Sequence, residues 1–284
     1  MATFKQKKIS SSTDLIKHHK AKPIIYVEGD TDKRVFENFW FVDLLEKISF
    51  STVSEAKGCS AVVKKVGIDR LNGVRAFGLV DRDKLMADDN WALLRETDDH
   101  VFDAACPYPD IKITRRWELE SYLIDPLVIE NYVAVAEGGR PSRPIATVEA
   151  DFLQHADALI PLAALNQALH LHRARSVGDG FSGVENRVRV DAKIRAEKIK
   201  NHPPLEPDYN SNLPIVDAFA GNPSSPVNSQ LYGLLRILSG KGMLERVCKA
   251  SKINHDLTYF LARDIKQADR VPLELKNFVN ECLS

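Results

Sequence analysis

Short runs of apolar and β-branched residues alternate with helical stretches over the first half of the chain. These runs are IIYV (24–27), ISFSTV (48–53), VRAFGLV (74–80) and IKIT (111–114). Strands that are separated by helical segments of 10 to 15 residues pair in parallel through right-handed connections. The sequence therefore predicts an α/β domain with a mostly parallel sheet over residues 23–135.

Helical patterns dominate after Pro141. They predict helices over residues 147–175 with a break at Pro161, 187–200, 229–238, 241–250, 256–268 and 272–282. The stretches NHPPLEPDYNSNLP and GNPSSP favour turns, so residues 201–228 are expected to form a long loop. We therefore expect an N-terminal segment (1–22), the α/β domain (23–135) and a mainly α-helical C-terminal domain (136–284) that completes the site and contacts partners.

The composition excludes several classes of protein. The 39 basic and 39 acidic residues give no net charge, so any binding of nucleic acid must depend on a local patch. The four cysteines, Cys59, Cys106, Cys248 and Cys282, lack CxxC spacing, which predicts neither a zinc site nor disulfides. No apolar run approaches the ~20 residues of a membrane span, and the N-terminus has no signal-peptide pattern, so we expect a cytoplasmic protein.

Acidic residues stand where two of the predicted strands end. Glu28 leaves the first strand and Asp81 leaves the third. In an open parallel sheet, ligands bind outside the carboxyl ends of the strands, so both carboxylates are expected to open onto one crevice. Alternation along extended backbone turns Asp81 and Asp83 to one side and Arg82 to the other. Asp32, four residues after Glu28, is expected to lean over the same edge.

Four carboxylates in one crevice would repel one another, because each negative charge raises the cost of ionising the next. A divalent cation relieves that repulsion. With no histidine or cysteine expected nearby, the oxygen ligands favour Mg²⁺ or Mn²⁺ over zinc.

The combination of VEGDTD with LVDRD resembles the Toprim fold of type IA and type II topoisomerases, bacterial primases and OLD-family nucleases, over about residues 22–125. Including WELESYLI and the helical tail, the whole chain resembles a group of small bacterial proteins. That group includes the nuclease effector subunit of the PARIS-type phage-defence pair. The resemblance implies a Toprim domain, Rossmann-like with a mostly parallel sheet, followed by the helical part.

The same resemblance implies a metal-dependent endonuclease, a hydrolase that acts as a toxin in antiviral defence by abortive infection. It implies a homodimer that cleaves tRNA after release from an ABC-type ATPase partner. An OLD-type DNA endonuclease and a non-catalytic nucleic-acid or protein-binding module are the alternatives. None of the seven tyrosines has a topoisomerase context, so a metal-activated water is the expected nucleophile.

Residue roles carried over from the resemblance concern the strand-end acids first. Glu28 would act as the general acid or base or as a metal ligand. Asp81 and Asp83 would be catalytic and hold Mg²⁺ or Mn²⁺, and Asp32 would complete a second metal site.

Two further residues of OLD-like sites, a glutamate and a lysine, have matches later in the chain. Glu120 in RRWELESYL matches the glutamate, a further metal ligand, with Glu118 close behind. Lys241 in LSGKGML matches the catalytic lysine, whose cation would stabilise charge on a leaving oxygen. The glycines that flank Lys241 are expected to leave room for a phosphate.

Simpler interpretations stand beside these. Glu28 and Gly29 are compatible with an ordinary solvated βα turn. The DRD sequence also resembles HAD phosphatases, but Leu85 stands where those enzymes usually have Thr or Val. Trp117 and Tyr122 could stack on bases, although core packing is the favoured interpretation.

One helical pattern places basic residues together. Arg189, Lys193 and Lys200 fall on nearly one face at helical spacing, opposite a strip containing Val188 and Ile199. This face is a candidate for contact with a phosphate backbone. A solvated helix face is the equally favoured alternative.

Overall fold

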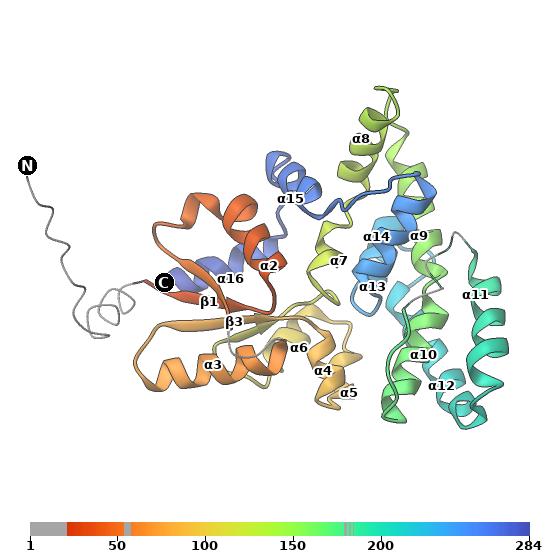
Figure 1. Ribbon diagram of the computed structural model, residues 1–284, viewed down its shortest axis with the longest axis horizontal. Coiled ribbons are helices and arrows are strands. Elements are labelled where there is room, and N and C mark those ends of the chain that lie inside the picture. The colour runs from red at the N-terminus through yellow and green to blue at the C-terminus, as the bar shows by residue number, and fades with distance from the viewer. Residues whose placement is uncertain (1–21, 54–57, 179–180, 182, 184) are drawn as a thin grey trace, which may run out of the picture. The chain divides into compact units, whose positions relative to one another are not determined.

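The chain folds into two compact units. The computed structural model describes residues 22–284 except 54–57, 179–180, 182 and 184 (Figure 1). Unit 1 comprises Met1–Val80, Tyr108–Lys112 and Leu273–Ser284, and unit 2 comprises Asp81–Pro107 and Ile113–Pro272.

The sheet of unit 1 has four strands in the order β2-β1-β3-β4. They are β1 (Ile24–Val27), β2 (Ser49–Thr52), β3 (Ala76–Val80) and β4 (Ile111–Ile113). β1 pairs in parallel with both neighbours, with Tyr26 opposite Ser51 of β2 and Gly78 of β3. All four residues of β1 are buried, as expected for a central parallel strand with both faces covered. The prediction of an α/β fold with a parallel sheet and a helical C-terminal part is confirmed.

Helices cover both faces of this sheet. Unit 1 contains α2 (Asp30–Val35), the π-helical turn η1 (Phe36–Trp40), the short η2 (Val42–Leu44), α3 (Cys59–Leu71) and α16 (Leu273–Leu283). A Cβ added to Gly78 would lie 2.9 Å from Val62 of α3, so α3 packs closely on that face. Leu79, whose side chain points to the opposite face, lines a small apolar space with Phe278 of α16. The sheet is thus enclosed between α3 and α16.

The position of α16 differs from the predicted division of the chain near residue 135. Its residues Leu275, Phe278 and Val279, spaced as one helical face, are buried against the sheet. The Arg75 guanidinium donates a hydrogen bond to the carbonyl of Cys282 at 3.1 Å. Because an apolar helix face packs wherever a matching surface exists, the last helix joins the first unit rather than the helical domain predicted for residues 136–284.

Unit 2 is helical. Its elements are α4 (Asp83–Ala87), α5 (Trp91–Leu94), α6 (Asp99–Ala104), α7 (Leu119–Leu123), α8 (Pro126–Ala136), α9 (Ile145–Asp157), α10 (Ile160–Leu171), α11 (Arg187–Ile194), η3 (Arg195–Ile199), η4 (Pro203–Leu205), α12 (Glu206–Asp217), η5 (Ala218–Ala220), α13 (Val227–Leu234), α14 (Gly240–Ala250) and α15 (Thr258–Gln267). The predicted break at Pro161 is confirmed, because Pro161 lies in the first turn of α10, where its missing N–H has no intrahelical partner to lose. Within the described residues, every helix is too short or too polar to cross a membrane.

The predicted loop over residues 201–228 is wrong, because α12 occupies its middle. Pro207 lies in the first helical turn, which tolerates proline, and Pro214 lies inside the helix. Tyr209, Asn212 and Val216 are buried at helical spacing. Packing of this face outweighs the low helix propensity of a segment rich in proline and asparagine.

Glu130 ties α8 to the segment that follows it. Its side chain is only 2% exposed and accepts hydrogen bonds from Arg140 Nη1 at 2.6 Å and from the Arg143 backbone at 2.8 Å and Nε at 3.0 Å. Burial alone would raise the pKa of Glu130, but the hydrogen bonds from Arg140 and Arg143 outweigh it and lower the pKa to about 2.

We expect Glu130→Gln to lower the free energy of unfolding at pH 7 by an amount on the order of 2–3 kcal/mol. A depressed carboxyl pKa contributes stability above the unfolded-state pKa of 4.5, and that contribution is lost as the pH falls toward about 2. The difference in Tm between wild type and variant should therefore shrink below pH 4.5. Glu137→Gln, at a glutamate 48% exposed in its side chain, is the control. A difference that does not change with pH would contradict this assignment.

Candidate functional site

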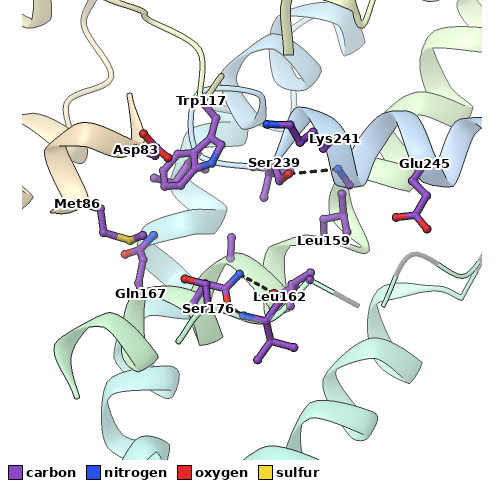
Figure 2. A pocket seen from close by; sticks show the side chains of 17 residues that line it. Asp83, Met86, Trp117, Leu159, Leu162, Gln167, Ser176, Ser239, Lys241 and Glu245 are labelled. Atoms are coloured by element: carbon purple, nitrogen blue, oxygen red, sulfur yellow. Dashed lines mark hydrogen bonds between the residues drawn. The ribbon is translucent and has the colours of Figure 1, made fainter. Parts of the chain in front are cut away.

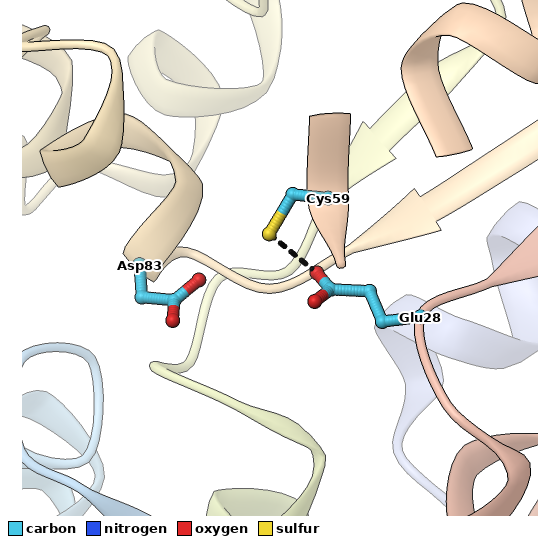
Figure 3. Close-up of side chains that lie close together, drawn as sticks. All are labelled: Glu28, Cys59 and Asp83. Carbon is cyan, nitrogen blue, oxygen red and sulfur yellow. Dashed lines mark hydrogen bonds between the residues drawn. The ribbon is translucent and has the colours of Figure 1, made fainter. Parts of the chain in front are cut away.

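Glu28 is the residue that leaves β1, and it is half-buried. Its Oε1 accepts a hydrogen bond from Cys59 Sγ at 2.9 Å (Figure 3). Cys59 is the first residue of α3, the helix that follows β2, the parallel neighbour of β1. The expectation that no cysteine lies near the strand-end acids is therefore wrong for Glu28. The rule that ligands gather at the carboxyl ends of parallel strands would have identified Cys59 as well.

Asp32 lies in the first turn of α2, also in unit 1. Its Oδ2 accepts a hydrogen bond from the backbone N–H of Gly29 at 3.0 Å. This contact satisfies an N–H that precedes the helix, as in a capping box. One of the two Asp32 carboxylate oxygens thus stabilises the turn after Glu28, and its predicted role in a second metal site remains a prediction.

Asp81 directly follows β3, and Asp83 begins α4 in unit 2. Both aspartates are half-buried, whereas Arg82 between them is fully buried. Arg82 has helical dihedral angles (φ −63°, ψ −25°), so the premise of extended backbone through this segment is wrong. The chain turns into α4 at once, and the contrast in burial comes from that turn, with Lys84 N–H donating to the Asp81 carbonyl at 3.2 Å.

Lys241, Glu118 and Glu120 form a charged cluster in unit 2, here called the Lys241 cluster. Glu118 is only 8% exposed and accepts from Lys241 Nζ, Lys241 N–H and Ser239 Oγ, each at 2.9 Å. Glu120 Oε1 lies 3.5 Å from Lys241 Nζ. Both glutamates considered in the sequence therefore pair with Lys241, and Glu118 makes the closer contacts.

Gly240 allows the Lys241 cluster to form. A Cβ at this position would lie 2.2 Å from the backbone nitrogen of Ser121 and 2.6 Å from the carbonyl carbon of Glu120. Only glycine permits the start of α14 to approach α7 so closely. The role predicted for the glycine before Lys241, to leave room for a phosphate, is wrong for Gly240, which packs against backbone. Ser239 caps α14 by accepting from Gly242 N–H at 3.2 Å, a role for which serine is a preferred residue.

The charged side chains of the Lys241 cluster shift one another's pKa. Burial raises the pKa of Glu120, the charge of Glu118 raises it further, and Lys241 opposes both effects. Burial alone would lower the pKa of Lys241, but the negative charges of Glu118, Glu120 and Asp81 together hold it above its usual range. Lys241 is therefore a permanent cation near neutral pH, suited to stabilising negative charge rather than to accepting a proton.

A pocket of about 420 Å³ lies within unit 2 (Figure 2). Asp83 and Lys241 line it together with Trp117, which is half-buried. Tyr122, the other aromatic considered for base stacking, is 4% exposed, and its hydroxyl accepts a hydrogen bond from the Arg116 backbone. Core packing is therefore the role of Tyr122, while Trp117 contributes to a concave surface.

The three basic residues predicted to contact nucleic acid do not share the predicted regular helix face. Arg189 and Lys200 are exposed, and Lys193 is half-buried with Nζ 5.2 Å from the centre of the Phe181 ring. The π-helical turn η3 interrupts the helix between Lys193 and Lys200 and changes the angular spacing. Val188, expected on the opposite strip, is 75% exposed.

Unit 2 thus brings Asp81, Asp83, Glu120 and Lys241 into one region, through the contacts of the Lys241 cluster, the charge of Asp81 and the shared pocket. Glu28 belongs to unit 1. Comparison of the chain with protein-family models, curated proteins and solved structures found no match in any of the three.

Proposed function

We propose that this protein is a metal-dependent endonuclease with a Toprim-type site. Glu28, Asp81 and Asp83 would bind Mg²⁺ or Mn²⁺, with Asp32 and Glu120 as further ligands. When bound, the metal ions would supply an activated water and neutralise charge on the phosphodiester.

The observation that carries the proposal is the register of the sheet. β1 and β3 are parallel neighbours, with Ile24 opposite Ala76 and Tyr26 opposite Gly78. Two residues beyond the Tyr26–Gly78 pair, Glu28 is level with Val80, the last residue of β3. Asp81 is the next residue of the chain. Glu28 and Asp81 therefore each follow the carboxyl end of one of two neighbouring parallel strands, the kind of position where open α/β folds bind their ligands.

The Lys241 cluster supplies the second support. A fixed cation beside carboxylates suits a reaction in which negative charge develops on a leaving oxygen. Glu120, whose Oε1 lies 3.5 Å from Lys241 Nζ, would lie beside that cation as a further metal ligand. Lys241 would hold the phosphate, and Glu28 would act as the general base or as a metal ligand.

The proposal extends to the biological role that the sequence resemblance implies. The enzyme would act in the cytoplasm as a toxic homodimeric effector of antiphage defence, with tRNA favoured over DNA as its substrate. An ABC-type ATPase would restrain it until infection. Arg189, Lys193 and Lys200 remain candidates for contact with the nucleic-acid backbone.

Purified protein incubated with total cellular RNA and supercoiled plasmid tests this function. In Mg²⁺ we expect discrete tRNA fragments on a denaturing gel, and in excess EDTA we expect none. Cleavage of the plasmid alone would support the DNA endonuclease instead. Intact RNA and intact plasmid in both Mg²⁺ and Mn²⁺ would refute the catalytic proposal. Added ATPase partner should suppress the cleavage.

A further inference from the structure

The pocket of unit 2 has largely apolar walls. Met86, Leu159, Leu162 and Ile237 contribute to them, and the polar residues Asp83 and Lys241 also line the pocket. A pocket of about 420 Å³ has room for a nucleotide-sized group. It combines apolar walls with charged groups that belong to the proposed active site.

Gln167, on α10, is the exceptional residue of this pocket. It is only 2% exposed, and within the described part of the chain neither its Nε2 nor its Oε1 has a hydrogen-bond partner. A buried amide without hydrogen bonds destabilises the folded protein, because it has lost its contacts with water and gained none in return. Its neighbour Asn166 uses both amide atoms, accepting from Val177 N–H at 2.8 Å and donating to the Val177 carbonyl at 2.9 Å. Asn166 therefore holds the pocket wall, while Gln167 presents an unused donor and acceptor.

Two further residues of the pocket indicate which kind of ligand could form hydrogen bonds with the Gln167 amide. Met86 lines the pocket together with Gln167 (Figure 2), and its unbranched, rotatable side chain can move aside for a ligand. Trp117 offers an aromatic ring to the pocket. The backbone of Trp117 is fixed, because its carbonyl accepts a hydrogen bond from Arg82 N–H at 3.0 Å and its N–H donates to the Leu235 carbonyl at 2.9 Å. A flat group that packs against Trp117 and carries adjacent donors and acceptors would satisfy Gln167. An aliphatic ligand would not.

We propose that this pocket binds one unpaired base of the nucleic-acid substrate, with Gln167 hydrogen-bonding the base edge and Trp117 packing against its face. This inference rests on the proposed function. Bases present a donor and an acceptor side by side, the pattern that a glutamine amide matches with two hydrogen bonds. Splayed-out single-stranded bases are read by such edge contacts and by aromatic stacking. The phosphate of that nucleotide would lie toward Lys241 and Asp83, at the proposed cleavage site.

The test measures binding without catalysis. The four nucleoside 5′-monophosphates, with ribose 5-phosphate as the probe that lacks a base, are titrated into the full chain in EDTA and followed by calorimetry. We expect at least one monophosphate to bind tighter than ribose 5-phosphate. Gln167→Met should weaken that binding about tenfold or more and leave Tm unchanged or higher, because it removes an unsatisfied buried amide.

Gln154→Met, the same change on the exposed surface of α9, is the matched control and should alter neither binding nor Tm. Trp117→Leu is the second variant and should also weaken binding. The proposal is overturned if no monophosphate binds tighter than ribose 5-phosphate, or if Gln167→Met and Trp117→Leu bind as wild type does. If the protein binds a base but cleaves no nucleic acid, the proposed nuclease function is refuted and the base-binding role of the pocket is supported. If it cleaves nucleic acid but shows no base-dependent binding, the base-binding role is refuted and the nuclease function is supported.

Discussion

Glu28→Gln is expected to reduce the rate of tRNA cleavage by about 10³-fold or more, with Tm unchanged within about 1 °C. The substitution removes one negative charge at the end of β1 and preserves side-chain volume. The amide oxygen of glutamine can still accept the hydrogen bond that Glu28 receives from Cys59 Sγ at 2.9 Å. The loss would therefore report on metal binding or proton transfer rather than on folding. Initial rates in Mg²⁺ and a thermal melt of the same preparation are the measurements.

Glu46→Gln provides the matched control, because Glu46 is an exposed glutamate of the same unit. It should leave both rate and Tm as in wild type. Cleavage by Glu28→Gln within tenfold of the wild-type rate would rule out a catalytic or metal-binding role for Glu28. A large fall in its Tm would show that the carboxylate is needed for folding, and the loss of rate would then carry no information on chemistry.

The strand ends were predictable because two local rules agree there. Apolar runs such as IIYV have few alternatives to a buried strand, and the acidic residues that end them cannot enter the core. The sequence therefore located Glu28 and Asp81 to the residue, since β1 ends at Val27 and β3 at Val80.

The remaining features depend on packing between segments far apart in the chain. The contact between Lys241 and Glu118 spans 123 positions and requires Gly240 to meet the backbone of α7, which no local pattern encodes. The position of α16 on the sheet depends likewise on a matching surface. Nothing in the sequence indicated that Gln167 could bind a ligand, because a buried glutamine without a hydrogen-bond partner cannot be distinguished in sequence from any other glutamine of a helix.

Arg82 shows how the aspartates on either side of it are held. Its Nη1 donates to the Arg115 carbonyl at 2.8 Å, its Nη2 donates to the Leu94 carbonyl at 2.9 Å, and its guanidinium carbon lies 4.2 Å from the centre of the Phe102 ring. The side chain is fully buried. Arg82 thus joins the turn after β3 to α5, α6 and the segment before α7.

Arg82→Met should therefore lower the free energy of unfolding by about 3–5 kcal/mol, because buried carbonyls that accept from the guanidinium lose their donor. The expected fall in Tm is roughly 10 °C. Arg189→Met, at an exposed arginine of α11, should change Tm by no more than about 1 °C. Thermal melts of both variants are the measurement, and a Tm for Arg82→Met within 2 °C of wild type would contradict the assignment. Because Asp81 and Asp83 are covalently attached to this anchor, the variant should also lose cleavage well below its own Tm. The arginine would then serve the chemistry by fixing the backbone between two carboxylates, without approaching the phosphate itself.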